Sequence, residues 1–189
     1  MDDRLKKSEW WVHSVSPTIA RRLVEKYHYS SGAPNTATYL HGLFRKGDIW
    51  GYQCVGVAWW LPPTKNAGYA TYPANGHGVL SLSRLVILPD VPKNAASFLL
   101  AGSRKLINRI IWPCLVTYAD KWQGHSGAIY RADNWEYMGE TKPQPCYVIN
   151  GRMIARKVGP VSRTHDEMIA LGAELLGSFA KHKFRRVIA

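Results

Sequence analysis

The feature that most constrains the fold is the segment from residue 80 to residue 139, where apolar runs alternate with helical spacing. Residues 82–88 (LSRLVIL) form an apolar run interrupted only by Arg84, and this predicts a strand buried on both faces. Apolar residues then recur at helical spacing as far as Ile110, and residues 114–119 form a second apolar run. A strand, a helix and a strand in this order predict a right-handed βαβ unit with parallel strands.

Polar residues cluster where this unit should bind ligands, at the carboxyl ends of its strands. Asp120 ends the second strand, and Trp122, Gln123 and His125 follow it. Asn94 precedes the predicted helix and is placed to cap it. We therefore expect the functional site beside these residues.

The rest of the chain predicts a mixture of strands and helices. Before the central unit we expect a strand over residues 10–15 and a helix over residues 17–27 that is capped at Ser16. A hairpin of residues 39–44 and 49–60 should turn at residues 46–48, and a loop should follow over residues 62–78. The loop either covers the pocket as a lid or is a connection of no consequence. After the unit we expect a short helix over residues 126–132 and a strand over residues 135–140. A hairpin over residues 147–155 and a last helix over residues 164–179 should follow.

A length of 189 residues fits one domain with a real core. We therefore predict a single α/β domain (residues 1–189) with a mixed central sheet flanked by helices, a basic N-terminal arm (1–9) and a basic C-terminal tail (181–189). The N-terminus lacks the apolar core of a signal peptide, and no apolar run approaches the roughly 20 residues of a membrane span. We expect a cytoplasmic protein with no membrane partner.

The charge balance points to a polyanion. Lys and Arg number 25 against 13 Asp and Glu, which gives a net charge of +12. This balance favours nucleic acid as partner, with an inert basic surface as the alternative. The predicted phosphate contacts are Lys6, Lys7, Lys181, Lys183, Arg185 and Arg186, although the tail could also be a solvated charge run.

Three motifs carry a family resemblance: YHYS at residues 27–30, LSRL around Arg84, and YADKWQGHSGAIYRADNWEYMG at residues 118–139. The order of elements resembles the GNAT acyltransferase superfamily, and the motifs resemble the Mom DNA-modification proteins of phage Mu and related prophages. The resemblance implies a GNAT-like fold and a transferase that converts adenine in double-stranded DNA to N6-carbamoylmethyl-adenine. In that family the modification protects phage DNA from host restriction, which implies the host cytoplasm as location.

One position departs from the acyl-CoA-dependent GNAT pattern. There a glycine-rich motif precedes the central helix and holds pyrophosphate at the helix N-terminus. Residues 91–96 (VPKNAA) contain no glycine, although Lys93 and the helix N-terminus could still hold an anion. The donor is therefore open between acyl-CoA, an aminoacyl carrier and another activated compound.

The expected chemistry assigns roles to named residues. The exocyclic amine of adenine is a poor nucleophile, so its modification needs proton removal, charge stabilisation and a base taken out of the stack. We expect Asp120 to accept or orient the amine proton, with a turn cap as the alternative. His28 is a candidate general base or, with Tyr29, a ligand of an iron-type metal ion; a packed histidine is the alternative. By resemblance, Tyr130 protonates the leaving group, and core packing is its alternative.

Further candidates contact the donor or the base. Arg84 is expected either to bind an anionic donor or to pair with Asp120, because a buried arginine needs a partner. The donor set is Arg84, Lys93, Asn94 and Ser83, and the base set is Ser30, Trp122, Gln123, His125, Asn134 and Trp135. Among these, Trp122 and Trp135, together with Tyr29, are candidates for stacking on a flipped base.

Two other functions stay open at this point. One is a GNAT N-acetyltransferase that acts on a protein or a small amine, and the other is a non-catalytic nucleic-acid-binding domain on a GNAT scaffold. A homodimer is open beside a monomer.

Overall fold

The computed structural model describes residues 4–30, 32–45, 53–158 and 161–188. Within these residues a large sheet has the order β1-β2-β3-β4-β5-β12-β6. Its strands are β1 (Trp10–Ser14), β2 (Tyr39–Arg45), β3 (Gln53–Leu61), β4 (Val79–Ile87), β5 (Cys114–Asp120), β12 (Lys181–Val187) and β6 (Glu136–Glu140). The predicted hairpin of β2 and β3 is confirmed by their antiparallel pairing, while its turn at residues 46–48 lies outside the described residues.

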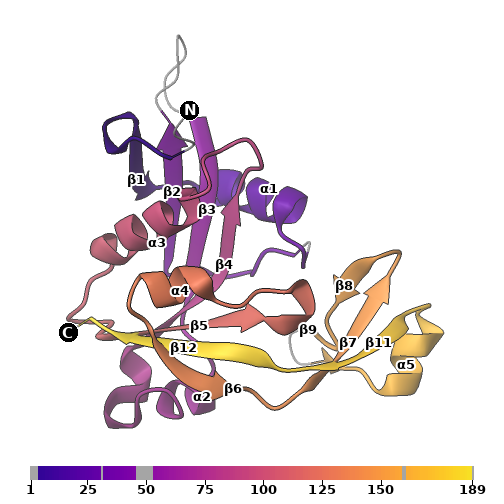
Figure 1. Ribbon diagram of the computed structural model, residues 1–189. Coiled ribbons are helices and arrows are strands. Elements are labelled where there is room, and N and C mark those ends of the chain that lie inside the picture. Colours follow the sequence, from indigo (N-terminus) through magenta and orange to yellow (C-terminus); the bar gives the residue numbers. More distant parts are fainter. Residues whose placement is uncertain (1–3, 31, 46–52, 159–160, 189) are drawn as a thin grey trace.

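The predicted parallel pair lies at the centre of the sheet. β4 pairs in parallel with β5, and the register runs from Val79↔Cys114 to Leu82↔Thr117. The pairing ends there, although both strands continue. Figure 1 shows the result, with the antiparallel strands β1 to β4 standing upright and β5 and β12 turned almost across them. The sheet therefore opens between the carboxyl-terminal halves of β4 and β5.

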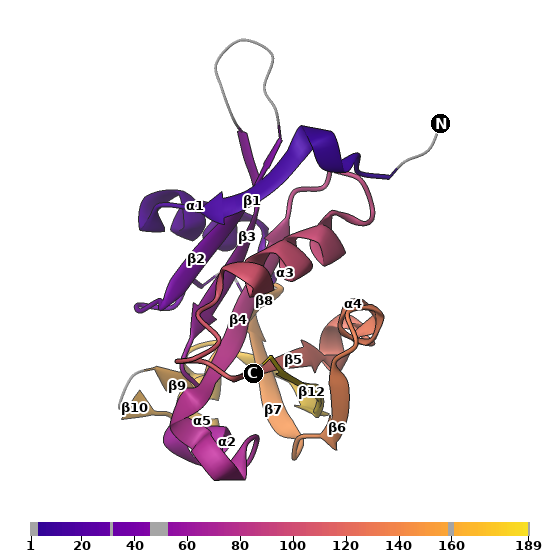
Figure 2. The same ribbon diagram turned by 90° about the vertical axis from the view of Figure 1, so that its left-hand side faces the viewer.

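Two helices cover opposite faces of the first half of the sheet (Figure 2). The helices are α1 (Pro17–Tyr27), capped by the Ser16 hydroxyl, and α3 (Ala95–Leu106). Successive side chains of a strand point to opposite faces. Accordingly Trp59 of β3 packs with α1, and its neighbour Trp60 packs with α3.

A smaller sheet projects beyond the large one (Figure 1). It has the order β11-β7-β8, with β7 (Gln144–Ile149), β8 (Arg152–Ile154) and β11 (Glu174–Phe179). The predicted hairpin is confirmed: β7 and β8 are joined at Asn150 and Gly151, whose φ angles are 49° and 74°. Between β8 and β11 lie a short ribbon of β9 (Lys157–Val158) and β10 (Val161–Ser162), then α5 (His165–Ala170). Helix α5 begins with a capping box, in which the side chains of Thr164 and Glu167 each accept from the other residue's backbone N–H.

Two predictions at the C-terminal side are wrong. The predicted helix over residues 164–179 ends at Ala170, because Gly172 turns the chain with a φ of 78°, and residues 174–179 form strand β11 instead. The predicted basic tail is strand β12, which lies between β5 and β6. Its cations are tolerated there because Asp120, Asp133 and Glu136 lie beside them.

Of the two alternatives for residues 62–78, the structure does not support a lid. Residues 62–78 contain helix α2 (Lys65–Tyr69) and a 3-10 turn, η2 (Pro73–Gly78), rather than an unstructured loop. They lead into the first residue of β4, whereas the sheet opens at the other end of that strand. Hydrogen bonds from Lys183 and Arg185 to the carbonyls of Ala70 and Thr71 fix the segment there.

The remaining elements are short: η1 (Lys7–Glu9), η3 (Lys121–Gln123) and α4 (Ala128–Ala132). The prediction that the central helix continues to Ile110 is wrong, because α3 ends at Leu106. No helix among the described residues is long and apolar enough to span a membrane.

Candidate active site

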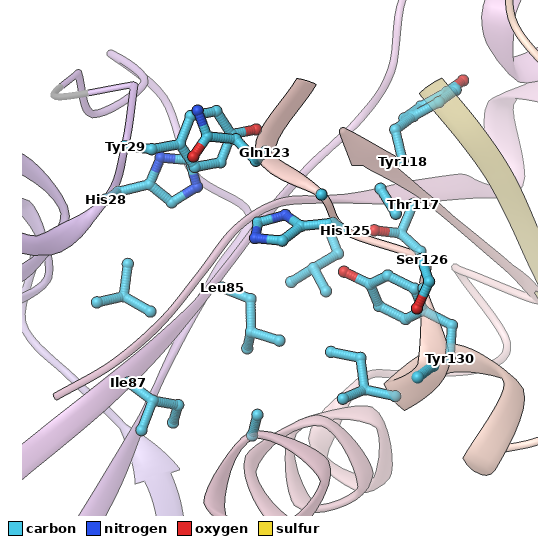
Figure 3. Close-up of a pocket in the computed structure, with 18 of the residues that line it drawn as sticks. His28, Tyr29, Leu85, Ile87, Thr117, Tyr118, Gln123, His125, Ser126 and Tyr130 are labelled. Atoms are coloured by element: carbon cyan, nitrogen blue, oxygen red, sulfur yellow. The ribbon is translucent and has the colours of Figure 1, made fainter. Parts of the chain in front are cut away.

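A cavity of about 580 Å³ fills the opening between β4 and β5. Its lining includes residues 27–29 at the end of α1, Leu82, Ser83 and 85–87 of β4, Ala96 of α3, 117–119 of β5, and 123–130. In Figure 3, His28, Tyr29 and Gln123 gather at one end of the cavity, Thr117, Ser126 and Tyr130 lie at the other, and His125 stands between them. The cavity thus lies where the βαβ unit was predicted to bind ligands.

His28 is held in one tautomer by its local hydrogen bonds. The backbone N–H of Ser30 donates to Nδ1 of His28 over 3.2 Å, and the Ser30 hydroxyl lies 2.8 Å from the same atom. A ring nitrogen that accepts from an N–H carries no proton of its own, so the proton of the neutral ring is on Nε2. Ser30 therefore contacts the cavity residue His28, as a positioning partner.

The surroundings of His28 keep it neutral. Burial lowers the pKa of His28 from 6.5 to about 4, and electrostatic interactions with Arg84, His125 and Lys181 also lower it, each more than Asp120 raises it. At pH 7 the imidazole therefore has a lone pair that is able to receive a proton.

Asp120 reaches the cavity through Tyr29. Its carboxylate is 4% exposed, and Oδ2 accepts from the Lys181 ammonium at 2.8 Å and from the Tyr29 hydroxyl at 3.4 Å. Burial and then Asp120 raise the pKa of Tyr29, so its hydroxyl keeps its proton. The other oxygen, Oδ1, accepts from the backbone N–H of Trp122, so Asp120 is also a turn cap, the alternative considered above.

The ring of Tyr29 joins the two histidines. It stacks on His28 with ring centroids 4.3 Å apart and meets His125 edge-on at 5.8 Å. The structure thus brings together the side chains of His28, Tyr29 and Asp120, which come from segments about 90 residues apart.

Tyr130 lies across the cavity from His28 (Figure 3). It is packed against Trp135 and Phe184, and burial raises its pKa against a smaller opposing effect of a hydrogen bond with Thr117. The phenol is therefore protonated at neutral pH and is able to donate that proton. Both the predicted acid role and the predicted core packing are compatible with this position.

Arg84 is hydrogen-bonded to the chain that follows His28 and to its own neighbour Ser83. Its guanidinium donates to the carbonyl of Gly32 at 3.1 Å and to the carbonyl and hydroxyl of Ser83. Arg84 therefore has Gly32 and Ser83 as partners and not Asp120, because the carboxylate of Asp120 pairs with Lys181. The described lining of the cavity includes Ser83 but not Arg84.

The other predicted site residues divide between the cavity and its surroundings. Gln123 and His125 line the cavity. Trp135 is 4% exposed in the core, where its indole N–H donates to Asp133, so the prediction that it stacks on a base is wrong. Asn134 is an exposed turn residue with a φ of 55°, outside the described lining.

The predicted donor residues before α3 also lie outside the described lining. The Asn94 side chain accepts from the backbone N–H of Leu5 at 2.8 Å instead of capping α3, so its predicted capping role is wrong. Lys93 is exposed, as are Lys6 and Lys7 of the arm. Trp122 is half-buried, and its backbone contacts Asp120.

Lys181 is a site residue whose role the sequence does not reveal. The sequence predicts it as a phosphate contact, but it is paired in register with Asp120 on the adjacent strand. The one signal for this pairing is that an isolated carboxylate at the end of a buried strand requires a cation.

Comparison with known proteins gives the family. The Mom protein family matches residues 9–187 of the chain. The chain belongs to this family. The methylcarbamoylase Mom of Escherichia phage Mu is 30% identical over 141 residues, which are 68% of this chain and 53% of the phage protein. The match to that Mom protein thus spans about half of its length.

Solved structures show the fold. Arabidopsis thaliana NAA60 in complex with acetyl-CoA is similar with a TM-score of 0.61 and 10% identity, covering 95% of this chain and 98% of that chain. A ribosomal-protein-alanine N-acetyltransferase from Brucella melitensis is similar with a TM-score of 0.54 and 11% identity, covering 94% and 99%. This Mom-family chain therefore has the predicted GNAT-like fold.

The residues proposed as metal ligands are engaged elsewhere. Nδ1 of His28 accepts from Ser30, and the hydroxyl of Tyr29 points to Asp120. Among the described residues there is no group of three or more His, Cys, Asp or Glu side chains that could hold a metal ion.

Proposed function

We propose that this protein transfers a carbamoylmethyl group to N6 of adenine in DNA, giving N6-carbamoylmethyl-adenine and protecting the DNA from restriction. The observation that carries the proposal is that His28 and Tyr130 line one cavity from opposite sides (Figure 3). Burial lowers the pKa of His28 and raises the pKa of Tyr130, which suits a base and an acid. Membership of the Mom family and the name of the phage Mu relative support this reaction.

The cavity suits a nucleobase taken out of the duplex. A volume of about 580 Å³ lies within the range of sites for small ligands. Its lining offers the aromatic rings of His28 and Tyr29 for stacking and the polar groups of Gln123 and His125 for the base edge.

The proton of the amine requires an acceptor when the bond between N6 and the donor carbon forms. Nδ1 of neutral His28 carries the lone pair and lies 2.8 Å from the Ser30 hydroxyl. That hydroxyl can take the amine proton while passing its own proton to Nδ1. The leaving group departs with a proton from Tyr130.

The donor would lie along β4. Beyond Leu82 the edge of β4 is no longer paired with β5, so an extended chain with amide groups can hydrogen-bond to it. Ala96 in the first turn of α3 also lines the cavity, and free N–H groups of a helix N-terminus bind anions. An activated donor with an amide arm and an anionic group fits these features, and acyl-CoA is one such donor.

The experiment is mass spectrometry of nucleosides from plasmid DNA of cells that express the protein. We expect a carbamoylmethyl adenosine with the unchanged chain, and a loss of about 10²-fold or more in Tyr130→Phe, which removes only the acid proton. Tyr69→Phe, at an exposed residue of α2 outside the described lining, is the matched control and should modify DNA normally.

Unmodified DNA from cells with soluble, well-expressed protein would refute the proposal. Acetylation of an amine by the same preparation would then favour the acetyltransferase alternative. DNA binding without modification would favour the non-catalytic one.

A further inference from the structure

One segment of the chain carries only positive charge. Residues 141–164 contain Lys142, Arg152, Arg156, Lys157 and Arg163 and no Asp or Glu, whereas the whole chain has about one acid for every two bases. We call this segment the basic hairpin region; it includes β7, β8, β9 and β10. Its charge is therefore not balanced within the segment itself.

The cations of β12 differ in this respect. Lys181 pairs with Asp120 at 2.8 Å, Arg185 with Glu136 at 2.6 Å, and Arg186 with Asp133 at 3.8 Å. A carboxylate beside a cation cancels most of its attraction for a phosphate. The residues predicted from sequence as phosphate contacts of a tail are thus largely neutralised.

Three cations of the basic hairpin region have no such carboxylate partner among the described residues. Arg152, Arg156 and Lys157 are exposed, and the ion pairs of the described residues include none of them. Arg156 is nevertheless held in place, because its Nε donates to the carbonyl of Arg163 at 2.9 Å while the Arg163 N–H donates to the carbonyl of Arg156 at 3.0 Å. The terminal nitrogens of this guanidinium remain as donors.

The smaller sheet, which lies beside these cations, is packed against apolar side chains. Tyr147, Ile149 and Ile154 pack around Met168 and Ala173, so one side of the β7–β8 hairpin is covered. Arg152 lies beside the turn of this hairpin, opposite Ile149, and Arg156 and Lys157 follow β8, with Lys157 in the β9–β10 pair. The three exposed cations are therefore carried by a packed sheet and by the segment that leaves it.

The region also lies next to the candidate active site. Lys181 pairs in register with Asp120 at the carboxyl end of β5, and two residues earlier Phe179 pairs with Gln144, the first residue of β7. The smaller sheet therefore begins at the end of β5 where the cavity opens, and Figure 1 shows it projecting from that end.

We infer that the basic hairpin region binds the phosphate backbone of duplex DNA and holds the duplex beside the cavity. The inference rests on the proposed function, since a base extruded into the cavity requires the neighbouring duplex to be held. Exposed guanidinium groups match phosphate in geometry and charge. Phosphate contacts position the duplex and carry no sequence information.

The test compares two triple variants that remove the same charge. Arg152→Ala/Arg156→Ala/Lys157→Ala changes the basic hairpin region, and Lys65→Ala/Lys105→Ala/Arg109→Ala changes exposed cations on α2 and near the end of α3. Fluorescence anisotropy with a duplex oligonucleotide gives Kd at several salt concentrations. Each lost phosphate contact lowers the slope of log K against log salt by about 0.9.

We expect the first variant to lose two to three units of slope and to bind roughly 100-fold more weakly at about 0.15 M salt. The control should stay within about 3-fold of the unchanged chain. Because Arg156 also bonds to Arg163, the double variant Arg152→Ala/Lys157→Ala is measured as well, together with the thermal unfolding of every variant. It should lose about two-thirds of the effect.

Equal slopes for the hairpin and control variants would overturn the inference, as would a duplex that does not bind the unchanged chain. Nucleoside mass spectrometry separates this failure from failure of the proposed function. Modified adenine with an unaffected hairpin variant would reject the surface alone. Unmodified adenine with a salt slope that depends on the hairpin would reject the reaction alone.

Discussion

Replacement of His41 should remove a large part of the acid sensitivity of the fold. His41 on β2 is 2% exposed, and its Nδ1 lies 2.7 Å from the hydroxyl of Ser103. The indole N–H of Trp60 donates to the same oxygen at 2.7 Å, so the hydroxyl is free to donate its proton to Nδ1. Burial and then the charge of His13 lower the pKa of His41 from 6.5 to about 4.

The direction of the pH effect follows from these two values. Below pH 6.5 the unfolded chain takes up a proton at His41, and the folded chain does so only near pH 4. The free energy of unfolding therefore falls as the pH falls through this window, by about 2 kcal/mol at pH 5 and about 3 kcal/mol below pH 4 from this residue.

Urea denaturation of His41→Asn at pH 7.5, 6 and 5 tests the argument. An asparagine oxygen accepts the Ser103 hydrogen bond and does not titrate. The stability of the unchanged chain relative to this variant should fall by about 2 kcal/mol between pH 7.5 and pH 5. His77→Asn, at an exposed histidine, should follow the unchanged chain. Parallel pH curves for the unchanged chain and His41→Asn would refute the reasoning.

Two further predictions concern the site. Lys181→Met leaves the buried carboxylate of Asp120 without its cation and should lower the free energy of unfolding by about 2 kcal/mol in urea denaturation. The control Lys65→Met should leave the free energy of unfolding unchanged. A loss below about 0.5 kcal/mol in Lys181→Met would mean that the ion pair contributes little. Gly127→Ala should lower the melting temperature more than Gly124→Ala does, because both residues have φ above 70° but only at Gly127 would a Cβ meet the ring of Phe184. Equal melting temperatures would show that the ring moves aside.

The central unit was predictable because its signals are local. Apolar runs and helical spacing between residues 80 and 120 follow from burial, and the parallel pair and the position of the site follow from the βαβ connection. His28, Tyr29, Asp120 and Tyr130 were identified with the help of family motifs, since residue types alone do not show that segments 91 residues apart meet.

The C-terminal side was not predictable in the same way. β12 (KHKFRRV) contains four Lys and Arg among its seven residues, a composition that normally marks a solvent-exposed segment, and within it only Phe184 is fully buried. What makes it an inner strand is the set of carboxylates on β5, β6 and the turn before β6, and sequence periodicity does not record such non-local pairing. In β11, Leu175 and Phe179 mimic helical spacing, although the positive φ of Gly172 separates them from α5.

The place of β12 between β5 and β6 also has a consequence for synthesis of the chain. Residues 114–120 and 136–140 leave the ribosome well before residues 181–187, which pair with both of them. Until then each strand presents an unpaired edge, and such edges associate with other chains. Contacts between distant residues also form slowly. We therefore expect ribosome-bound chains that have not yet exposed residues 181–187 to depend on chaperones for solubility, and the sheet to close when this strand emerges.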